Sequence, residues 1–314
     1  MLKQKDKLHY ETQLLAGLER YEREVGLLNG ITYFENRQAL IEQIIDSIRR
    51  VQYVQAIGSQ QISQDRVDPN SSLFDPLKAA VFYRNNGNHD EACWLVYLAI
   101  HFGKHLVDGW RLTRDIYGAL GMTNGPFTWQ VMQGYPNAIN DWLSQNYQAM
   151  RNDGVSRRFG NHRKYETLRP TSKGTGAAVR SYVDWVMRYG SHGDWFDRSI
   201  KTAQGDRREA FSWLYRTMRV HKFGRTAKFD YLTMLAKLDL APIEANSAYL
   251  TGATGPLSGA KLLYGGRTTS SLSADKLDAS LIELAKYLDI GMQEMEDALC
   301  NWQKSPGRYV AFRG

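Results

Sequence analysis

Ten residues in the middle of the chain combine nitrogen-rich side chains with a small glycine turn. The polar members of this stretch, FGNHRKYETL at residues 159–168, are Asn161, His162, Arg163, Lys164 and Glu166. Cations beside a glycine can bind phosphate oxygens through charge-assisted hydrogen bonds. A neighbouring histidine or carboxylate can move a proton. The stretch predicts an anion-binding site with chemistry beside it, and the plain alternative is a solvated basic turn.

Three other stretches add cations close to a glycine. HFGKH supplies Lys104 and His105, and GWRLTRD supplies Arg111. FGR supplies Arg225, ahead of Lys228 and Asp230. We predict that they widen the anion cradle, since Lys and Arg suit phosphate or carboxylate contacts. The histidines of HFGKH have no carboxylate-rich partner at ligand spacing, so no metal site is predicted.

Positive charge is concentrated in the same region. The chain has 40 Lys and Arg against 33 Asp and Glu, and residues 151–230 contain 18 of the former and 8 of the latter. A clustered basic patch is typical of a protein that binds a polyanion such as DNA. The alternative is a basic surface without a partner.

A second kind of phosphate contact is suggested by YLTGATGPLSGAKLL, residues 249–263. Two glycines, a proline and a small-residue segment resemble the hairpin of helix-hairpin-helix modules, where backbone N–H groups meet a DNA phosphate. The turn has one residue more than the usual G-x-G, and an ordinary helix C-cap is the alternative. The candidate DNA-binding residues are Gly252, Gly255, Ser258 and Lys261.

Two carboxylates near the C-terminus are further catalytic candidates. Asp275 follows the hairpin, although it could simply cap the next helix. Glu296 begins EDALCNWQK, whose polar residues could share one helix face. A surface helix with buried Leu299 and Trp302 is the alternative for that segment.

The apolar pattern is helical nearly throughout. Residues 40–54 carry an amphipathic stripe, and DEACWLVYLAIHFGKH reads as a buried central helix. Convincing alternating strands are absent, so we predict an all-α protein. Residues 59–76 and 265–274 read as loops. A charged helical extension is expected over residues 1–35, followed by one α-helical catalytic domain over 36–314, which could have two lobes with the cleft between them.

Several protein classes are disfavoured by what the sequence lacks. It has no signal-like apolar run near its start, no stretch of membrane-span length and no CxxC pair. We therefore expect a cytoplasmic protein without membrane contact. Walker, GxGxxG, GxSxG and zinc-deaminase motifs are also missing.

Seven motifs occur in one order along the chain: HFGKH, GWRLTRDIYGALG, FGNHRKYETL, GTGAAVRSYVDWV, FGRTAKFDYL, YLTGATGPLSGAKLLYGG and EDALCNWQK. The set resembles the α-glutamyl/putrescinyl thymine pyrophosphorylases, in particular their third clade, from about Gln38 to the C-terminus. FGNHRKYE and EDALCNWQK are its specific strings. Because that family is related to helix-hairpin-helix DNA glycosylases, the resemblance implies a DNA-glycosylase-like multi-helix fold.

The resemblance also implies a reaction, that of amino acid:DNA transferases in phage base hypermodification. There, 5-hydroxymethyluracil in double-stranded DNA carries a phosphate or pyrophosphate, and the amine of an amino acid or polyamine displaces it at the 5-methylene carbon. The implied partners are that DNA and a small amine donor. No cofactor is implied, although Mg²⁺ could accompany the pyrophosphate.

Such a reaction needs cations for the leaving group, a base for the amine and a pocket for a flipped nucleobase. Arg163 and Lys164 fit the first need, and His162 could bind a phosphate oxygen or act as the base. Glu166, Asp275 or Glu296 could orient or deprotonate the amine. Three aromatic residues could stack on the flipped base: Trp110, Trp129 and Tyr165.

Two other functions stay open at this point. A DNA glycosylase would use Asp275 or Asp278 to break an N-glycosidic bond, and it would leave abasic sites. A DNA-binding module without catalysis would bind through residues 151–230 in a salt-dependent way and change no nucleoside.

Overall fold

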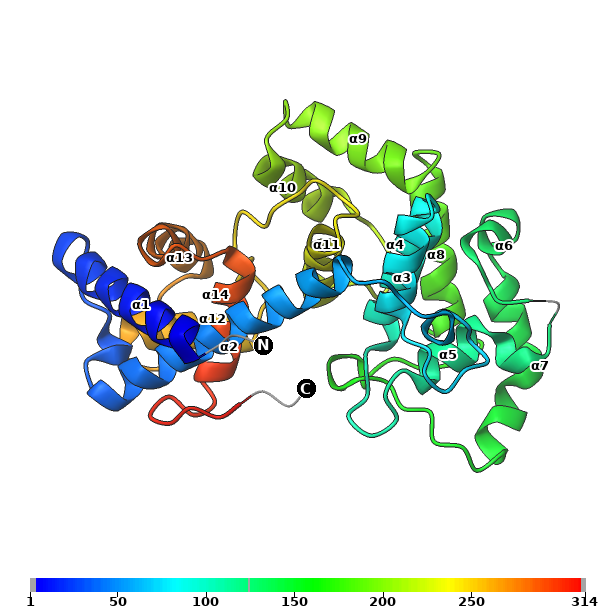
Figure 1. Cartoon of the computed structure of the whole chain (residues 1–314), viewed down its shortest axis with the longest axis horizontal. Helices are drawn as coiled ribbons and strands as arrows, with labels where there is room; N and C mark the ends of the chain where they lie inside the picture. Colours follow the sequence, from blue (N-terminus) through cyan, green and yellow to red (C-terminus); the bar gives the residue numbers. More distant parts are fainter. Residues whose placement is uncertain (1–3, 124, 312–314) are drawn as a thin grey trace. The chain divides into compact units, whose positions relative to one another are not determined.

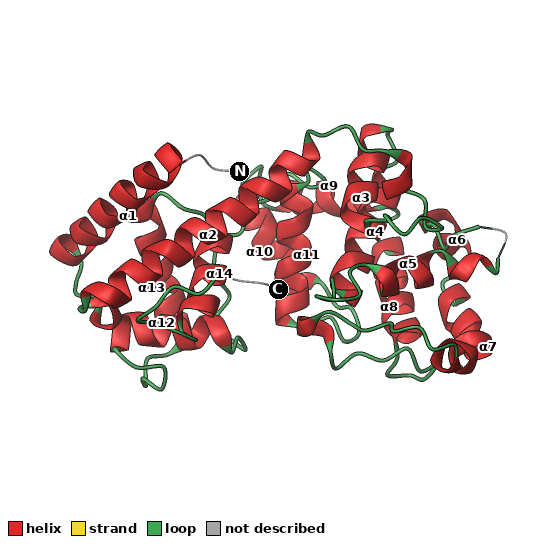
Figure 2. Cartoon of the chain, turned by 60° about the horizontal axis from the view of Figure 1, so that its bottom comes forward, coloured by secondary structure: helices red, strands yellow, loops and turns green. Residues whose placement is uncertain are grey.

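The computed structural model describes residues 4–123 and 125–311, where helices are joined by loops (Figure 2). Over these residues it has fourteen α-helices and four short 3₁₀ helices. No strand occurs in the described part, where one isolated bridge joins His105 and Gly109. The predicted all-α fold class is confirmed.

The chain divides into two compact units that are not contiguous in sequence (Figure 1). The first unit comprises Met1–Ala56 and Ala245–Arg313, and the second comprises Ile57–Glu244 together with Gly314. Residues before 36 thus group with the C-terminal segment. The functional division into an extension over 1–35 and a catalytic domain over 36–314 stays a prediction.

The first unit is a small helical bundle. Its helices are α1 (Gln4–Glu24), the 3₁₀ helix η1 (Asn29–Ile31), most of α2 (Phe34–Gly58), α12 (Gly255–Gly265), α13 (Ala274–Leu288) and α14 (Met292–Trp302). Helix α12 lies against α14, and α1 lies against α13. A Cβ on Gly259 would come within 2.4 Å of the Leu299 carbonyl oxygen, so the small residues let α12 approach α14 closely.

The predicted helix-hairpin-helix element is not confirmed. Helix α12 does begin at Gly255, with Pro256 in its first turn, where a missing N–H costs no hydrogen bond. No helix precedes it, however, because α11 ends at Lys237 and residues 238–254 are turns and irregular segments. Asp278 holds this segment by accepting hydrogen bonds from the Ser247 hydroxyl and the Leu250 N–H.

The second unit contains the remaining α-helices. They are α3 (Pro76–Asn85), α4 (His89–Phe102), α5 (Arg111–Tyr117), α6 (Trp129–Gly134), α7 (Ala138–Asn152), α8 (Thr175–Met187), α9 (His192–Thr202), α10 (Arg207–Thr217) and α11 (Arg225–Lys237). The central helix is α4, which packs on α3, α5, α6, α9 and α11. Eleven of its fourteen residues are buried. The predicted buried helix is therefore confirmed.

Helix α4 begins and packs for reasons that its sequence supplies. The Asn88 side chain caps it by accepting a hydrogen bond from the Glu91 N–H. The buried Glu91 carboxylate accepts from the Tyr117 hydroxyl at 2.6 Å and from the Trp129 N–H at 2.5 Å. Burial raises the pKa of Glu91 to about 7. Glu91 thus joins α4 to α5 and α6 in the core.

An aromatic cluster joins α4 to α8 and α11. The rings of Tyr97 and Tyr182 stack with centroids 3.7 Å apart. The Tyr182 hydroxyl lies 2.7 Å from that of Tyr231 and 2.6 Å from Nε2 of His192, all of them buried. These contacts fix the three helices whose ends support the site described next.

Candidate active site

Two of the motifs meet at a glycine–glycine contact in the second unit. Gly103 follows α4 with a φ of +69°, and the Gly160 N–H donates to the Phe102 carbonyl at 2.8 Å. A Cβ on Gly160 would lie 2.8 Å from the Gly103 carbonyl carbon and 3.1 Å from the Lys104 nitrogen. Glycine is required because the two backbones touch. HFGKH and FGNHRKYETL therefore form one surface.

Arg163 anchors that surface to two helices. Its Nε donates to the Ile100 carbonyl at the end of α4 at 2.7 Å. Its Nη2 donates to Oδ2 of Asp230 on α11 at 3.2 Å. The Arg163 side chain keeps 11% of its surface exposed. Arg163 is predicted to bind phosphate, and in the structure its Nε and Nη2 donate to protein groups.

Asp230 is a carboxylate in a recess. Its side chain keeps 39% of its surface exposed, yet burial raises its pKa, against the opposing effect of Arg163, His162, Lys237 and Arg225. Exposure and desolvation together mean that protein atoms surround the carboxylate on most sides while solvent still reaches it. Oδ2 is bonded to Arg163, and Oδ1 has no hydrogen bond within residues 4–123 and 125–311.

A second ion pair lies nearby. Lys222 Nζ lies 2.9 Å from Glu166 Oε2 and donates to the Lys173 carbonyl. The positive charges of Arg163 and Lys222 both disfavour protonation of His101. Nε2 of His101 lies 3.1 Å from the Thr175 hydroxyl at the start of α8. Burial, reinforced by these two cations, lowers the pKa of His101 to about 3. His101 is therefore neutral at physiological pH, and Glu166 is held by a cation.

Three predicted residues of the same loop face solvent. Asn161, His162 and Lys164 are exposed, within or just after the short 3₁₀ helix η4 (Asn161–Arg163). Lys164 Nζ lies 5.3 Å from the centre of the Tyr165 ring, which is 83% exposed. Beside them Lys104 is exposed, with Nζ 6.0 Å from the Trp110 ring. These side chains are open to solvent on one loop surface.

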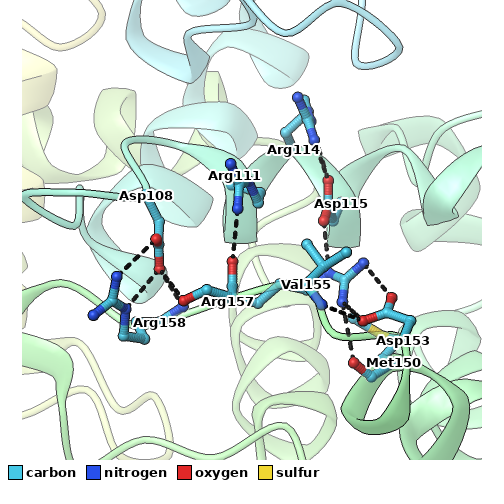
Figure 3. Close-up of polar contacts among 10 residues, drawn as sticks. Asp108, Arg111, Arg114, Asp115, Met150, Asp153, Val155, Arg157 and Arg158 are labelled. Carbon is cyan, nitrogen blue, oxygen red and sulfur yellow. Dashed lines mark hydrogen bonds and ion pairs between the residues drawn. The ribbon is translucent and has the colours of Figure 1, made fainter.

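Arg111 and His105 have local partners. Arg111 Nη1 donates to the Ser156 carbonyl at 3.2 Å (Figure 3). His105 Nδ1 accepts hydrogen bonds from the Val107 and Asp108 N–H groups. Both contacts stabilise loops at the edge of the surface. Arg225, at the start of α11, has its guanidinium 5.1 Å from the Phe229 ring.

Part of the basic charge of residues 151–230 is neutralised internally, as Figure 3 shows. Arg157 pairs with Asp115 at 2.6 Å and with Asp153 at 2.7 Å. Arg158 donates to both oxygens of Asp108, at 2.8 and 2.9 Å. These bonds hold the pKa of Asp108 well below its usual range. Arg157 and Arg158 thus fix the loop after α7 against α5.

The remaining predicted residues lie in the first unit, and they stay predictions. Asp275, in the first turn of α13, accepts from the Thr251 hydroxyl at 3.2 Å. Gly252, with a φ of +78°, lies in the turn before α12. Four predicted residues are half-buried: Gly255, Ser258 and Lys261 on α12, and Glu296 on α14. A Cβ on Gly255 would lie 2.6 Å from the Cys300 sulfur, so close packing of α12 on α14 explains the glycine at this position.

The string EDALCNWQK has a clear structural role in its own unit. Asp297 of α14 accepts from the Arg50 guanidinium of α2 at 2.7 Å and from the Ser47 hydroxyl at 2.9 Å. Asn301 donates to Asp297 and accepts from Lys304 at 3.1 Å. The polar face predicted for this helix therefore holds α14 on α2.

The sequence pattern noted Asp230 beside FGR but assigned it no role, and it did not indicate Lys222. Asp230 lies between Phe229 and Tyr231, which are both buried. A carboxylate at the edge of a core, one turn after Arg225, is the signal that could have found it. Of the predicted stacking residues, Trp129 is buried at 4% exposure and belongs to the core.

Within the described ranges, no three His, Cys, Asp or Glu side chains gather in a group that could hold a metal ion. No described helix combines the length and apolar character that crossing a bilayer requires.

Comparison with known proteins agrees with the motif order. Residues 35–314 match the family described as alpha-glutamyl/putrescinyl thymine pyrophosphorylase clade 3. The chain belongs to this family. No curated protein and no solved structure matches it. Membership in clade 3 indicates an enzyme that acts on thymine. The match begins at the start of α2, so it includes the second unit and the part of the first unit that follows residue 34.

Proposed function

We propose that this clade 3 protein is a DNA base-modifying transferase. It displaces the phosphate or pyrophosphate of phosphorylated 5-hydroxymethyluracil in DNA with the amine of an amino acid or polyamine. The observation that carries the proposal is the arrangement at Arg163, which orients the recessed carboxylate of Asp230 and lies in the same loop as exposed His162 and Lys164.

The reaction uses both kinds of group. The amine nitrogen attacks the 5-methylene carbon and forms a C–N bond. The C–O bond to the leaving group breaks, and its electron pair departs with the phosphate or pyrophosphate. Exposed Lys104, His162 and Lys164 stabilise the charge that grows on the leaving oxygens. Mg²⁺, if it accompanies the pyrophosphate, would supply further positive charge.

The proton that the nitrogen loses needs an acceptor, and Asp230 is suited to that role. Its raised pKa makes it a stronger base than an ordinary aspartate. Its Oδ2 is oriented by Arg163, and its Oδ1 can face an ammonium group. The same carboxylate can hold the incoming ammonium before transfer by direct charge pairing. Glu166 is less suited because Lys222 already pairs with it.

The test is a nucleoside analysis by mass spectrometry. DNA carrying pyrophosphorylated 5-hydroxymethyluracil is incubated with the protein and a mixture of amino acids and polyamines, then digested. The expected product is heavier than 5-hydroxymethyl-deoxyuridine by one amine minus water. Asp230→Asn keeps the shape but removes the base, so kcat/KM is expected to fall about 100-fold. Asp184→Asn, an exposed aspartate of α8, is the matched control.

The outcomes separate the proposal from its rivals. Unchanged DNA with every amine would reject the transferase for this substrate. Free base with abasic sites would favour a glycosylase. Full activity of Asp230→Asn beside an active wild type would keep the reaction and reject Asp230 as its base.

A further inference from the structure

The hairpin of residues 105–109 presents two aliphatic side chains to solvent. Leu106 is 76% exposed and Val107 is 74% exposed. Among the described leucines and valines, no other is as exposed as either. Contiguous exposed apolar side chains indicate an interaction surface more strongly than single exposed residues do.

The hairpin tip is rigidly built. His105 and Gly109 exchange backbone hydrogen bonds of 3.0 and 2.9 Å, and Gly109 has a φ of +59°. His105 Nδ1 accepts from the N–H groups of Val107 and Asp108, at 3.2 and 3.1 Å. The Asp108 carboxylate, only 3% exposed, is fixed by Arg158. The tip cannot fold back to bury its aliphatic residues without breaking these bonds.

The hairpin starts at the candidate active site. Its first residue follows Lys104, whose backbone nitrogen would lie 3.1 Å from a Cβ on Gly160. Lys104 is exposed, and Arg158 keeps 52% of its side-chain surface exposed while it pairs with Asp108. An apolar tip between cations fits a partner that has an apolar interior and anionic edges. Double-stranded DNA has both, in its base stack and its phosphates.

We propose that Leu106 and Val107 form a wedge that enters duplex DNA beside the modified base. The proposal rests on DNA being the substrate of the proposed function. A base that leaves the stack exposes an apolar gap, and aliphatic side chains between base steps can fill it. A tip that is already rigid loses little conformational entropy on insertion. Lys104 and Arg158 then lie where backbone phosphates flank the gap.

The first test measures base unstacking and needs no catalysis. Duplex DNA carries 2-aminopurine next to 5-hydroxymethyluracil, and the fluorescence gain on saturation with full-length protein is recorded. Wild type is expected to raise the fluorescence. The double variant Leu106→Ala/Val107→Ala is expected to lose most of that gain. Leu73→Ala/Val131→Ala removes an exposed leucine and an exposed valine elsewhere in the second unit and should keep it.

The second test uses the transfer reaction on two forms of the same DNA. In a duplex the wedge lowers the cost of extruding the base, so the double variant should lose about tenfold in kcat/KM. In a single strand the base is already accessible, so the loss should stay below about twofold. Equal losses on both forms would mean that the tip shapes the site, and the wedge would be overturned.

The two failures can be told apart. If wild type transfers no amine, the proposed function fails, while the fluorescence test still decides on the wedge. If wild type leaves 2-aminopurine stacked, or if the double variant unstacks it as well as wild type, the wedge is wrong. If the double variant unstacks 2-aminopurine as well as wild type does, the exposed tip would instead contact another macromolecule.

Discussion

Acid sensitivity of the second unit should depend on His101, which lies behind the site and contacts Thr175. Burial is the main reason that its pKa is about 3, compared with 6.5 for a solvated histidine, and Arg163 and Lys222 add to the effect. Because the folded-state pKa is the lower one, the unfolded chain takes up the proton first. The stability contribution of neutral His101 is therefore fully present above pH 6.5 and is lost as pH falls toward 3.

The size of the effect follows from the two pKa values. Between pH 7 and pH 5, protonation of the unfolded chain lowers the free energy of unfolding by about 2 kcal/mol. No discount for solvent screening is needed, since His101 is only 3% exposed. Glu91 acts in the opposite direction, because its raised pKa of about 7 makes it destabilising as pH rises. A comparison of two proteins that both contain Glu91 cancels its contribution.

The comparison is between wild type and His101→Gln, whose amide can still bond Thr175. Urea unfolding at pH 7 and pH 5 is followed by tryptophan fluorescence, which reports on the second unit because it holds seven of the eight tryptophans. Wild type should lose about 2 kcal/mol more than the variant on acidification. His221→Gln, an exposed histidine of the same unit, should behave like wild type. Equal losses in wild type and His101→Gln would refute the reasoning.

Two further substitutions test how the site is supported. Gly160→Ala should destabilise the second unit by about 1–3 kcal/mol in urea unfolding, because its Cβ would lie 2.8 Å from a backbone carbon. Gly134→Ala, with no atom within 4 Å of the added Cβ, should not, and a similar loss for both would contradict the role of the contact. Arg157→Met should cost about 2 kcal/mol by thermal unfolding, since it removes the charged donor from Oδ2 of buried Asp115 and leaves that carboxylate with Arg114 alone. The control Arg180→Met breaks an exposed ion pair and should cost under about 0.5 kcal/mol. An equally small effect of Arg157→Met would show that the network in Figure 3 contributes little to stability.

Much of the fold was predictable because helix formation leaves a local signal. The apolar run of α4 and the amphipathic stripe of α2 are periodic patterns that need no knowledge of distant residues. The meeting of HFGKH with FGNHRKYETL was also indicated, since both place cations beside glycines. The glycines have an additional reason that sequence does not reveal: Gly103 and Gly160 are neighbours.

The features that the sequence did not predict depend on contacts between residues far apart in the chain. The hairpin at 249–263 has the right turn residues, but the helix that should precede it is absent, because Asp278 holds residues 247–250 in an irregular path. The grouping of residues 1–56 with 245–313 brings together the two ends of the chain. No pattern within either segment could predict that pairing.

The same limit applies to charge. Residues 151–230 carry 18 cationic side chains, and a count treats each as available to DNA. The ion pairs show that some of these side chains are already bound to carboxylates of the protein. Arg157, Arg158, Arg163 and Lys222 each pair with a carboxylate, and three of these carboxylates come from outside FGNHRKYETL and its neighbouring loop: Asp108, Asp115 and Asp230.

This division explains how a cationic loop can fold beside other cations. Like charges repel most strongly where water is excluded. Half-buried Arg157 is neutralised by Asp115, and half-buried Arg163 by Asp230, so folding places no unpaired cation from these positions in the interior. The cations left exposed, Lys104 and Lys164, then face solvent on a surface whose backbone is held by the paired ones. Paired arginines supply rigidity and exposed lysines supply positive charge, which is the arrangement that the proposed transfer reaction would use to stabilise a leaving phosphate.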